Sequence, residues 1–222
     1  MKREHSIKIK VCGMTQIEQV RQLERLGVDY AGFIFYERSA RYAADKVDAV
    51  ELKQLTGISK TGVFVNADYD VVLQTAEAYS LNAVQLHGDE TPDFCKRVSS
   101  YIKTIKAFRL TGEEDLQSLI EDYENAVDYY LFDTRAETYG GTGKKFNWNI
   151  LKQQVAVGKP YFLSGGVGPD DAPLINDFIS ESMNDLYAID LNSKFETVPG
   201  VKDLSLLKIF LDEIKSGQDH HL

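Results

Sequence analysis

Short apolar runs alternate with longer amphipathic stretches along the whole chain, and this alternation constrains the fold more than any other feature. Eight runs rich in β-branched and aromatic residues predict strands at 8–12, 30–35, 61–65, 83–86, 104–108, 129–133, 160–164 and 187–191. The stretches that follow them predict helices at 16–26, 43–55, 69–80, 92–99, 113–125, 148–155, 169–176 and 204–214. Because parallel strands need a crossover, repeated strand–helix units indicate a parallel sheet.

The predicted strands are apolar throughout, as in 30–35, which is typical of strands covered on both faces. The chain has 222 residues, close to the size of one α/β barrel, and no linker or change in composition divides it. We predict an α/β fold, a single eight-stranded parallel βα (TIM) barrel, with one domain spanning 1–222. A doubly wound open sheet alternates in the same way, but eight units without an obvious reversal favour closure.

Local signals mark the ends of the first predicted helix. Thr15 precedes it and Glu18 follows three residues later, which is the pattern of a capping box. Gly27 stands where a helix commonly ends with a left-handed glycine. Val20, Leu23 and Leu26 share the spacing of a core-facing side.

Composition excludes several classes of protein. A formal net charge of -9 argues against a nucleic-acid partner and against a polybasic membrane anchor. The two cysteines, Cys12 and Cys95, have no metal-site spacing and form no disulfide framework, so we expect a reducing, cytoplasmic location. No signal-type run opens the chain, and no apolar segment approaches the roughly 20 residues of a membrane span.

Polar side chains are concentrated where the predicted strands end, whereas the strand interiors are apolar. In a βα barrel the carboxyl ends of the strands carry the active site. We therefore expect a site built from the residues at these ends, which include Cys12, Asn66, His87, Arg109, Asp133, Ser164 and the segment from Asp190 to Ser193.

Cys12 and Asp133 end two different predicted strands, so a closed barrel would place a thiol opposite a carboxyl group at its mouth. A thiolate is a competent base, but the ordinary thiol pKa is about 8.5, so the site must favour ionisation. We expect no lysine or histidine near Cys12 in the sequence to lower the thiol pKa, so any such effect must come from the fold. An aspartate pKa near 3.9 must likewise be raised by burial or a negative neighbour before Asp133 acts as an acid.

Each of these residues also has a plain structural interpretation. Cys12 can be a small buried apolar residue, and Asp133 can cap the following helix. Cys95 lies in a predicted helix, where a core position is the better interpretation.

The loops after the seventh and eighth strands predict a phosphate site. Gly165 and Gly166 follow strand seven, and Asn192 and Ser193 follow strand eight, which is where barrels of this type commonly bind phosphate. Backbone N–H groups there can bind an anion although the protein is acidic.

Four further residues are candidate substrate contacts. Arg41 lies in the loop after the second strand and is either a solvated surface arginine or a fork for a substrate carboxylate. His87 is more often structural than functional at such a position. Gly141 belongs to a glycine-rich loop that lacks the P-loop spacing and is expected to bend over a ligand. Asp190 ends the eighth strand. The other histidines lie near the termini, and we expect no metal site.

Taken together and in order, these motifs resemble the phosphoribosylanthranilate isomerase family of tryptophan biosynthesis. The resemblance spans nearly the whole chain and rests on the segments 10–15, 32–36, 39–42, 62–66, 84–88, 132–134, 140–143, 164–166 and 199–203. It implies a single barrel that converts N-(5-phosphoribosyl)anthranilate to 1-(2-carboxyphenylamino)-1-deoxyribulose 5-phosphate, an Amadori rearrangement without cofactor or metal.

The resemblance also implies roles for individual residues. Asp133 would be the general acid that opens the ribose ring, and Cys12 the general base that removes the C2 proton. Arg41 matches the arginine near the anthranilate carboxylate. The residues after strands seven and eight match the phosphate site, but Lys194 stands where the family commonly has glycine. We hypothesise that phosphate still binds there and that Lys194 points away or adds charge.

Two other functions remain as alternatives. Another phosphosugar isomerase or epimerase would suit the scaffold, but the histidine-pathway isomerase is expected to use paired aspartates, and here the first strand ends in a cysteine. A non-catalytic phosphate-binding barrel is disfavoured because both Cys12 and Asp133 are present. The partner we expect is a small phosphosugar, with the protein a monomer or homodimer.

Overall fold

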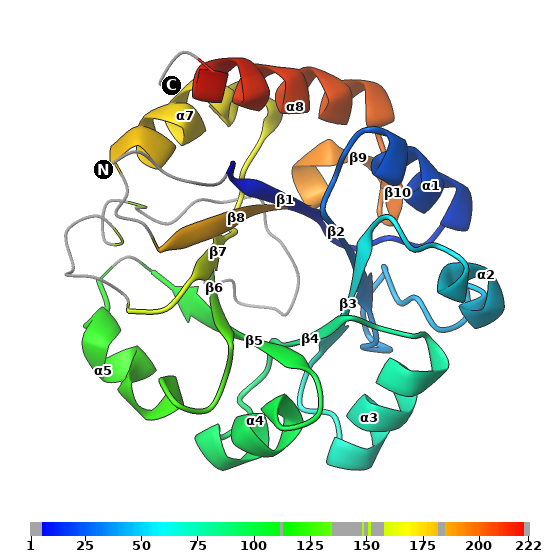
Figure 1. Ribbon diagram of the computed structural model, residues 1–222, viewed down its shortest axis with the longest axis vertical. Coiled ribbons are helices and arrows are strands. Elements are labelled where there is room, and N and C mark those ends of the chain that lie inside the picture. Colours follow the sequence, from blue (N-terminus) through cyan, green and yellow to red (C-terminus); the bar gives the residue numbers. More distant parts are fainter. Residues whose placement is uncertain are drawn as a thin grey trace.

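Eight parallel strands close into a barrel in the computed structural model, which describes residues 6–111, 113–134, 148, 151, 158–181 and 185–219. Figure 1 shows the ring of strands with helices outside it. The strands are β1 (Lys8–Val11), β2 (Tyr30–Ile34), β3 (Ser59–Phe64), β4 (Ala83–Leu86), β5 (Lys103–Leu110), β6 (Tyr129–Thr134), β7 (Tyr161–Leu163) and β8 (Leu186–Leu191). Each pairs with the next, and β1 pairs with β8, so the predicted barrel is confirmed and the open sheet is excluded.

The helices cover the outer face of the ring (Figure 1). They are α1 (Ile17–Arg25), α2 (Ala49–Lys53), α3 (Tyr69–Ala78), α4 (Pro92–Ser99), α5 (Leu116–Ile120), α7 (Ala172–Glu181) and α8 (Leu204–Asp219), with short 3-10 turns η1 (Glu121–Tyr123), η2 (Pro169–Asp171) and η3 (Ser193–Phe195). The helix expected at 148–155 lies, apart from Trp148 and Leu151, outside the described residues. The one expected at 43–55 begins only at Ala49, because the Asp48 side chain accepts from the backbone N–H groups of Val50 and Glu51.

The capping box predicted for the first helix is wrong. Helix α1 begins after Gln16, which makes no side-chain cap. The Thr15 hydroxyl instead donates to the Gly200 carbonyl at 2.6 Å, a partner 185 residues away. The predicted end is confirmed, since Gly27 has a φ of 76°. Val20 and Leu23 are buried on the inner side of α1 as expected.

A small hairpin follows β8 and was not predicted. Its strands are β9 (Glu196–Val198) and β10 (Val201–Lys202), paired antiparallel. The Gln19 side chain of α1 exchanges two hydrogen bonds with the Lys202 backbone, at 2.8 and 2.9 Å. The hairpin is thereby fixed against α1 at the barrel mouth, where it carries Glu196 and Lys202.

Side-chain alternation along the strands separates two environments. Residues of one parity pack beneath the helices in the large apolar core, and those of the other face the barrel interior. Near the amino-terminal end the interior is aromatic, with Tyr30 and Tyr187 sharing a hydrogen bond of 2.6 Å beside Phe162. The inward positions become polar towards the carboxyl ends, which is where a site is expected.

Among the described residues, no helix has the length and apolar character that crossing a membrane requires.

A buried carboxylate joins the carboxyl ends of three neighbouring strands. Glu90 forms an ion pair of 2.8 Å with Lys106 of β5, and both side chains are almost fully buried. Glu90 also accepts from the backbone N–H of Asn66, which follows β3, and of Gly88, which follows β4. This carboxylate therefore holds the backbone beside His87.

We expect Glu90→Ala to destabilise the protein by about 3–5 kcal/mol, because Lys106 would be left buried without a counter-ion. Urea unfolding followed by circular dichroism measures the change. The matched control is Asp212→Ala, which removes an exposed partner of Lys208 and should change stability little. Equal losses in the two variants would contradict the role given to Glu90.

Candidate active site

One open pocket lies at the carboxyl ends of the strands and gathers most of the predicted site residues. Its interior holds about 100 Å³ and opens to solvent at the mouth of the barrel. Its lining includes Cys12, His87, Asp133, Gly165, Gly166, Asp190, Asn192 and Ser193. Arg41 is not part of this lining, and Gly141 lies outside the described residues. Within the described part of the chain, no cluster of side chains suits a metal ion.

Cys12 lies directly after β1, with its backbone N–H donating to the Leu191 carbonyl of β8 at 2.8 Å. The neighbouring strand makes room for its sulfur: a methyl group on Gly32 would lie 2.7 Å from Sγ. Burial raises the pKa of the Cys12 thiol, whereas Lys10 and Lys202 act to lower it. The expectation that no lysine near Cys12 in sequence would help was wrong, because Lys10 stands two residues earlier and faces the same way.

Asp133 is held by a short chain of polar groups. His87 Nε2 lies 3.3 Å from Asp133 Oδ2, and Gln85 Nε2 lies 2.7 Å from His87 Nδ1. When the Gln85 amide donates to Nδ1, neutral His87 carries its proton on Nε2 and donates it to Asp133. The other carboxylate oxygen accepts from the Thr134 backbone at 2.8 Å. The carboxyl group therefore has a fixed orientation towards the pocket.

The loop after β7 turns back onto β6. Gly165 and Gly166 have φ values of 91° and 75°, which favour glycine. A methyl group on Gly165 would lie 2.4 Å from Thr134 Oγ1 and 3.3 Å from an Asp133 oxygen. The loop can therefore pass against the candidate acid only because residue 165 has no side chain. The Gly168 N–H, by contrast, already donates to Asp171 at 2.6 Å.

The loop after β8 supplies Asn192 and Ser193. Asn192 Oδ1 accepts from Lys202 Nζ at 2.9 Å, so its side chain is anchored to the hairpin. Lys194 lines the pocket and is exposed.

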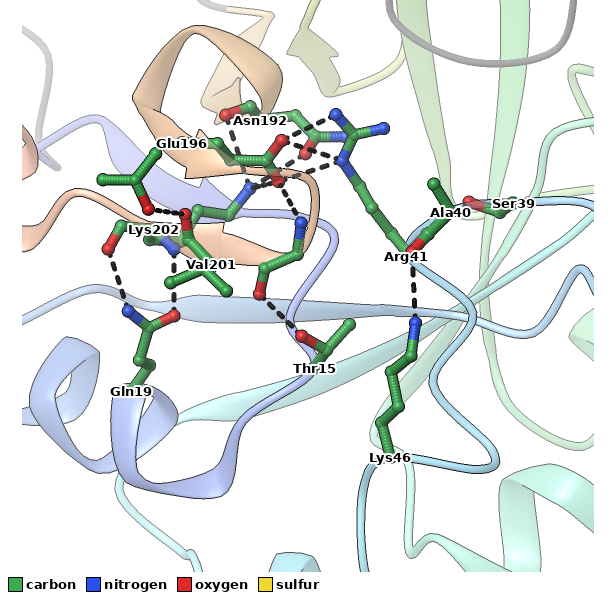
Figure 2. A network of polar contacts seen from close by, with 12 residues as sticks. Thr15, Gln19, Ser39, Ala40, Arg41, Lys46, Asn192, Glu196, Val201 and Lys202 are labelled. Atoms are coloured by element: carbon green, nitrogen blue, oxygen red, sulfur yellow. Dashed lines mark hydrogen bonds and ion pairs between the residues drawn. The ribbon is translucent and has the colours of Figure 1, made fainter.

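Arg41 forms a two-pronged ion pair with Glu196 of the hairpin, as Figure 2 shows. Its Nε lies 2.9 Å from Oε1 and its Nη2 lies 2.6 Å from Oε2. Lys202 Nζ approaches the same carboxylate at 2.7 Å. The arginine stem passes over Gly13, where a methyl group would lie 2.6 Å from Cδ. Arg41 thus meets a carboxylate of its own chain, and its contact with a substrate carboxylate stays a prediction.

Sequence reasoning missed four residues that shape the site: Lys10, Gln85, Glu196 and Lys202. Lys10 and Gln85 carried a usable signal, since each is a polar residue two positions before a candidate residue and so faces the same side of its strand. Glu196 and Lys202 gave no such signal, because only the hairpin brings them to Arg41.

The barrel is closed, and the pocket at the carboxyl ends of its strands is lined by a candidate acid and a candidate base. These features define the class of protein, which is a βα-barrel enzyme. Residues 9–213 match a family model described as N-(5'phosphoribosyl)anthranilate (PRA) isomerase. The N-(5'-phosphoribosyl)anthranilate isomerase of Parabacteroides distasonis is 42% identical over 210 residues, covering 93% of this chain and 92% of the relative.

Solved structures agree with the sequence relatives. The phosphoribosyl anthranilate isomerase of Thermotoga maritima has a TM-score of 0.84 at 31% identity, covering 95% of this chain and 99% of its own. A solved structure of a phosphoribosyl anthranilate isomerase in complex with reduced 1-(o-carboxyphenylamino)-1-deoxyribulose 5-phosphate has a TM-score of 0.76 at 28% identity, covering 95% of this chain and 99% of its own. The chain belongs to the N-(5'-phosphoribosyl)anthranilate isomerase family.

The Arg41–Glu196–Lys202 group predicts a pH-dependent contribution to stability. Burial alone would raise the pKa of Glu196, but Arg41 and Lys202 hold it below its ordinary value. A carboxyl whose pKa is lower when folded stabilises the protein above its unfolded pKa, about 4.3, and loses that effect as pH falls through the folded value. We expect Glu196→Gln to cost about 1–3 kcal/mol at pH 7 and progressively less below pH 4.

Urea unfolding of both proteins between pH 3 and 7 checks this. Glu77→Gln on the exposed side of α3 is the control and should change stability little at any pH. A cost for Glu196→Gln that does not shrink in acid would refute the ionic role.

Proposed function

We propose that this chain isomerises N-(5'-phosphoribosyl)anthranilate to 1-(2-carboxyphenylamino)-1-deoxyribulose 5-phosphate in tryptophan biosynthesis, with Asp133 as general acid and Cys12 as general base. The observation that supports these roles is that one pocket is lined by both a thiol and a carboxyl group, in a chain that matches the family from residue 9 to residue 213. The reaction needs two proton transfers at different atoms, which two separate groups can perform.

In the first step Asp133 donates a proton to the ribose ring oxygen. The C1–O bond breaks, its electrons stay on the oxygen, and the anthranilate nitrogen supplies the lone pair that forms a C=N bond. His87, which contacts Asp133 at 3.3 Å, keeps the carboxyl oriented towards this oxygen. The product of the step is an open-chain Schiff base.

In the second step the Cys12 thiolate removes the proton from C2. The electrons of the C–H bond form a C1=C2 double bond and neutralise the nitrogen, which gives an enolamine. This tautomerises to the ketone product by moving a proton to C1. Oxidation at C2 and reduction at C1 balance within the substrate, so the proposed steps involve no cofactor or metal. Each acid or base contributes a factor of order 10² to 10⁴.

Substrate binding is assigned to the two ends of the pocket. Backbone and side-chain donors at Gly165, Gly166, Asn192 and Ser193 take the phosphate, where glycine loops leave N–H groups accessible. Arg41 takes the anthranilate carboxylate, which requires its guanidinium to share or release Glu196. His87, Gly141 and Asp190 are additional proposed contacts.

We also propose a cytoplasmic protein that works as a monomer or homodimer and binds neither nucleic acid nor membrane. The net charge of -9 supports the absence of nucleic-acid binding.

Substitution of the two groups tests the mechanism. We expect Cys12→Ala and Asp133→Asn each to lower kcat by about 10²–10⁴, since each removes one proton transfer. Turnover is followed as loss of anthranilate fluorescence, with substrate generated in the assay. Cys95→Ala removes the other buried thiol, which lies in α4, and should keep near wild-type activity. Wild-type rates in both site variants would overturn the assignment.

Lys194 provides a separate test of the phosphate site. If its ammonium contributes to phosphate binding, Lys194→Ala should raise KM about threefold to tenfold at low salt, and the difference should shrink with ionic strength. Lys208→Ala, on the exposed side of α8, is the charge-matched control. A KM that stays unchanged at every salt concentration would exclude a direct role for this lysine.

A further inference from the structure

A lysine is buried inside the barrel directly beneath the candidate base. Lys10 and Cys12 are two positions apart, and so face the same side of β1, the side that lines the interior. The Lys10 side chain has no exposed surface. A buried ammonium is costly unless its charge is compensated, so its partners identify what it does.

Two acidic groups share this ammonium. Lys10 Nζ lies 2.8 Å from Asp190 Oδ1, on the strand that closes the barrel, and its charge also acts to lower the pKa of the Cys12 thiol. Asp190 Oδ2 in turn lies 3.3 Å from Ser164 Oγ. Asp190 and Cys12 line the pocket, whereas Lys10 lies behind them.

The other cations facing Cys12 already have partners. The charge of Lys202 acts to lower the pKa of Cys12, Cys12 acts to raise the pKa of Arg41, and both cations form ion pairs with Glu196. Both therefore share one carboxylate, which lies outside the pocket lining.

Two further titratable groups act on this cluster from the opposite side, through Asp190. Asp133 of β6 raises the pKa of Asp190, and His87, after β4, lowers it, although burial and Lys10 act on Asp190 more strongly.

We propose that Lys10 is a positioning residue of the reaction, which supplies the positive charge that stabilises the Cys12 thiolate, while Asp190 fixes Lys10 and limits that effect. This inference rests on the proposed role of Cys12 as the base. Burial would lower the pKa of Lys10, but Asp190 and Cys12 keep it above its ordinary value, so the group stays cationic. When Cys12 loses its proton, the new negative charge therefore forms beside a cation that is already in place, which is electrostatic preorganisation.

The test compares two variants that differ only in the lysine. Asp190→Asn leaves Lys10 without its carboxylate, and Lys10→Met/Asp190→Asn removes both charges, so the double variant leaves no unpaired charge to unfold the barrel. The readout is the pH dependence of Cys12 alkylation by iodoacetamide in the free enzyme, located by peptide mass spectrometry. Cys95, whose pKa burial raises to about 12, serves as the internal reference.

We expect Cys12 to react faster at pH 7 in Asp190→Asn than in the wild type. In the double variant, Cys12 should react at least about tenfold more slowly than in Asp190→Asn, because a neighbouring opposite charge shifts a pKa by about 1–3 units. Lys10→Arg should keep the wild-type profile. Lys60→Met is the matched control, because Lys60 is a buried strand lysine whose Nζ donates to the Leu52 and Leu55 carbonyls rather than to the site.

Identical alkylation profiles in Asp190→Asn and the double variant would overturn the proposal. It would also be overturned if Lys60→Met slowed the alkylation of Cys12 as much as the loss of Lys10 does. Because alkylation is measured without substrate, it reports on Lys10 independently of turnover. Failure of the isomerase assay would refute the proposed function and leave this result standing.

Discussion

The pairing of β1 with β8 closes the barrel, and the site depends on this one set of hydrogen bonds. The pairing places Lys10 opposite Asp190, although the two residues lie 180 positions apart in the sequence. One residue beyond β1, the backbone N–H of Cys12 donates to the Leu191 carbonyl. In an open sheet these strands would be unpaired edges, and a lysine at this position would have no buried carboxylate beside it. Closure therefore makes a charged side chain tolerable inside an otherwise apolar strand.

Around this pairing, cations and carboxylates are matched in separate groups. Inside the barrel, Lys10 forms an ion pair with Asp190 and lies on the same side of β1 as Cys12. On the hairpin, Lys202 and Arg41 both form ion pairs with Glu196. A third pair, Lys106 with Glu90, fixes the backbone on the opposite side of the mouth. Such fixed charges do not reorganise when a proton moves, which is how a rigid barrel can favour the charged state of its base.

The errors made from sequence have a common physical origin. The strands were placed correctly because each is a short apolar run, and the helix expected at 92–99 is confirmed, with Thr91 capping it through a local hydrogen bond. Thr15 has the same kind of signal, but its hydroxyl binds Gly200, a long-range partner that local rules do not include. The same applies to Arg41, whose partner Glu196 lies 155 residues away.

Alternation and short motifs are local properties of the chain, so the barrel, the order of the strand-end residues and the family could all be predicted from the residues alone. The position of Lys10 could also have been recognised from the sequence, since it lies two positions before Cys12 and so on the same side of the strand. Only the tertiary structure decided which charges meet: that Asp190 compensates Lys10, that His87 contacts Asp133, and that Arg41 is held by Glu196. Ion pairs and hydrogen bonds act over a few ångströms in space, and strand pairing and the hairpin, rather than distance along the chain, set those separations.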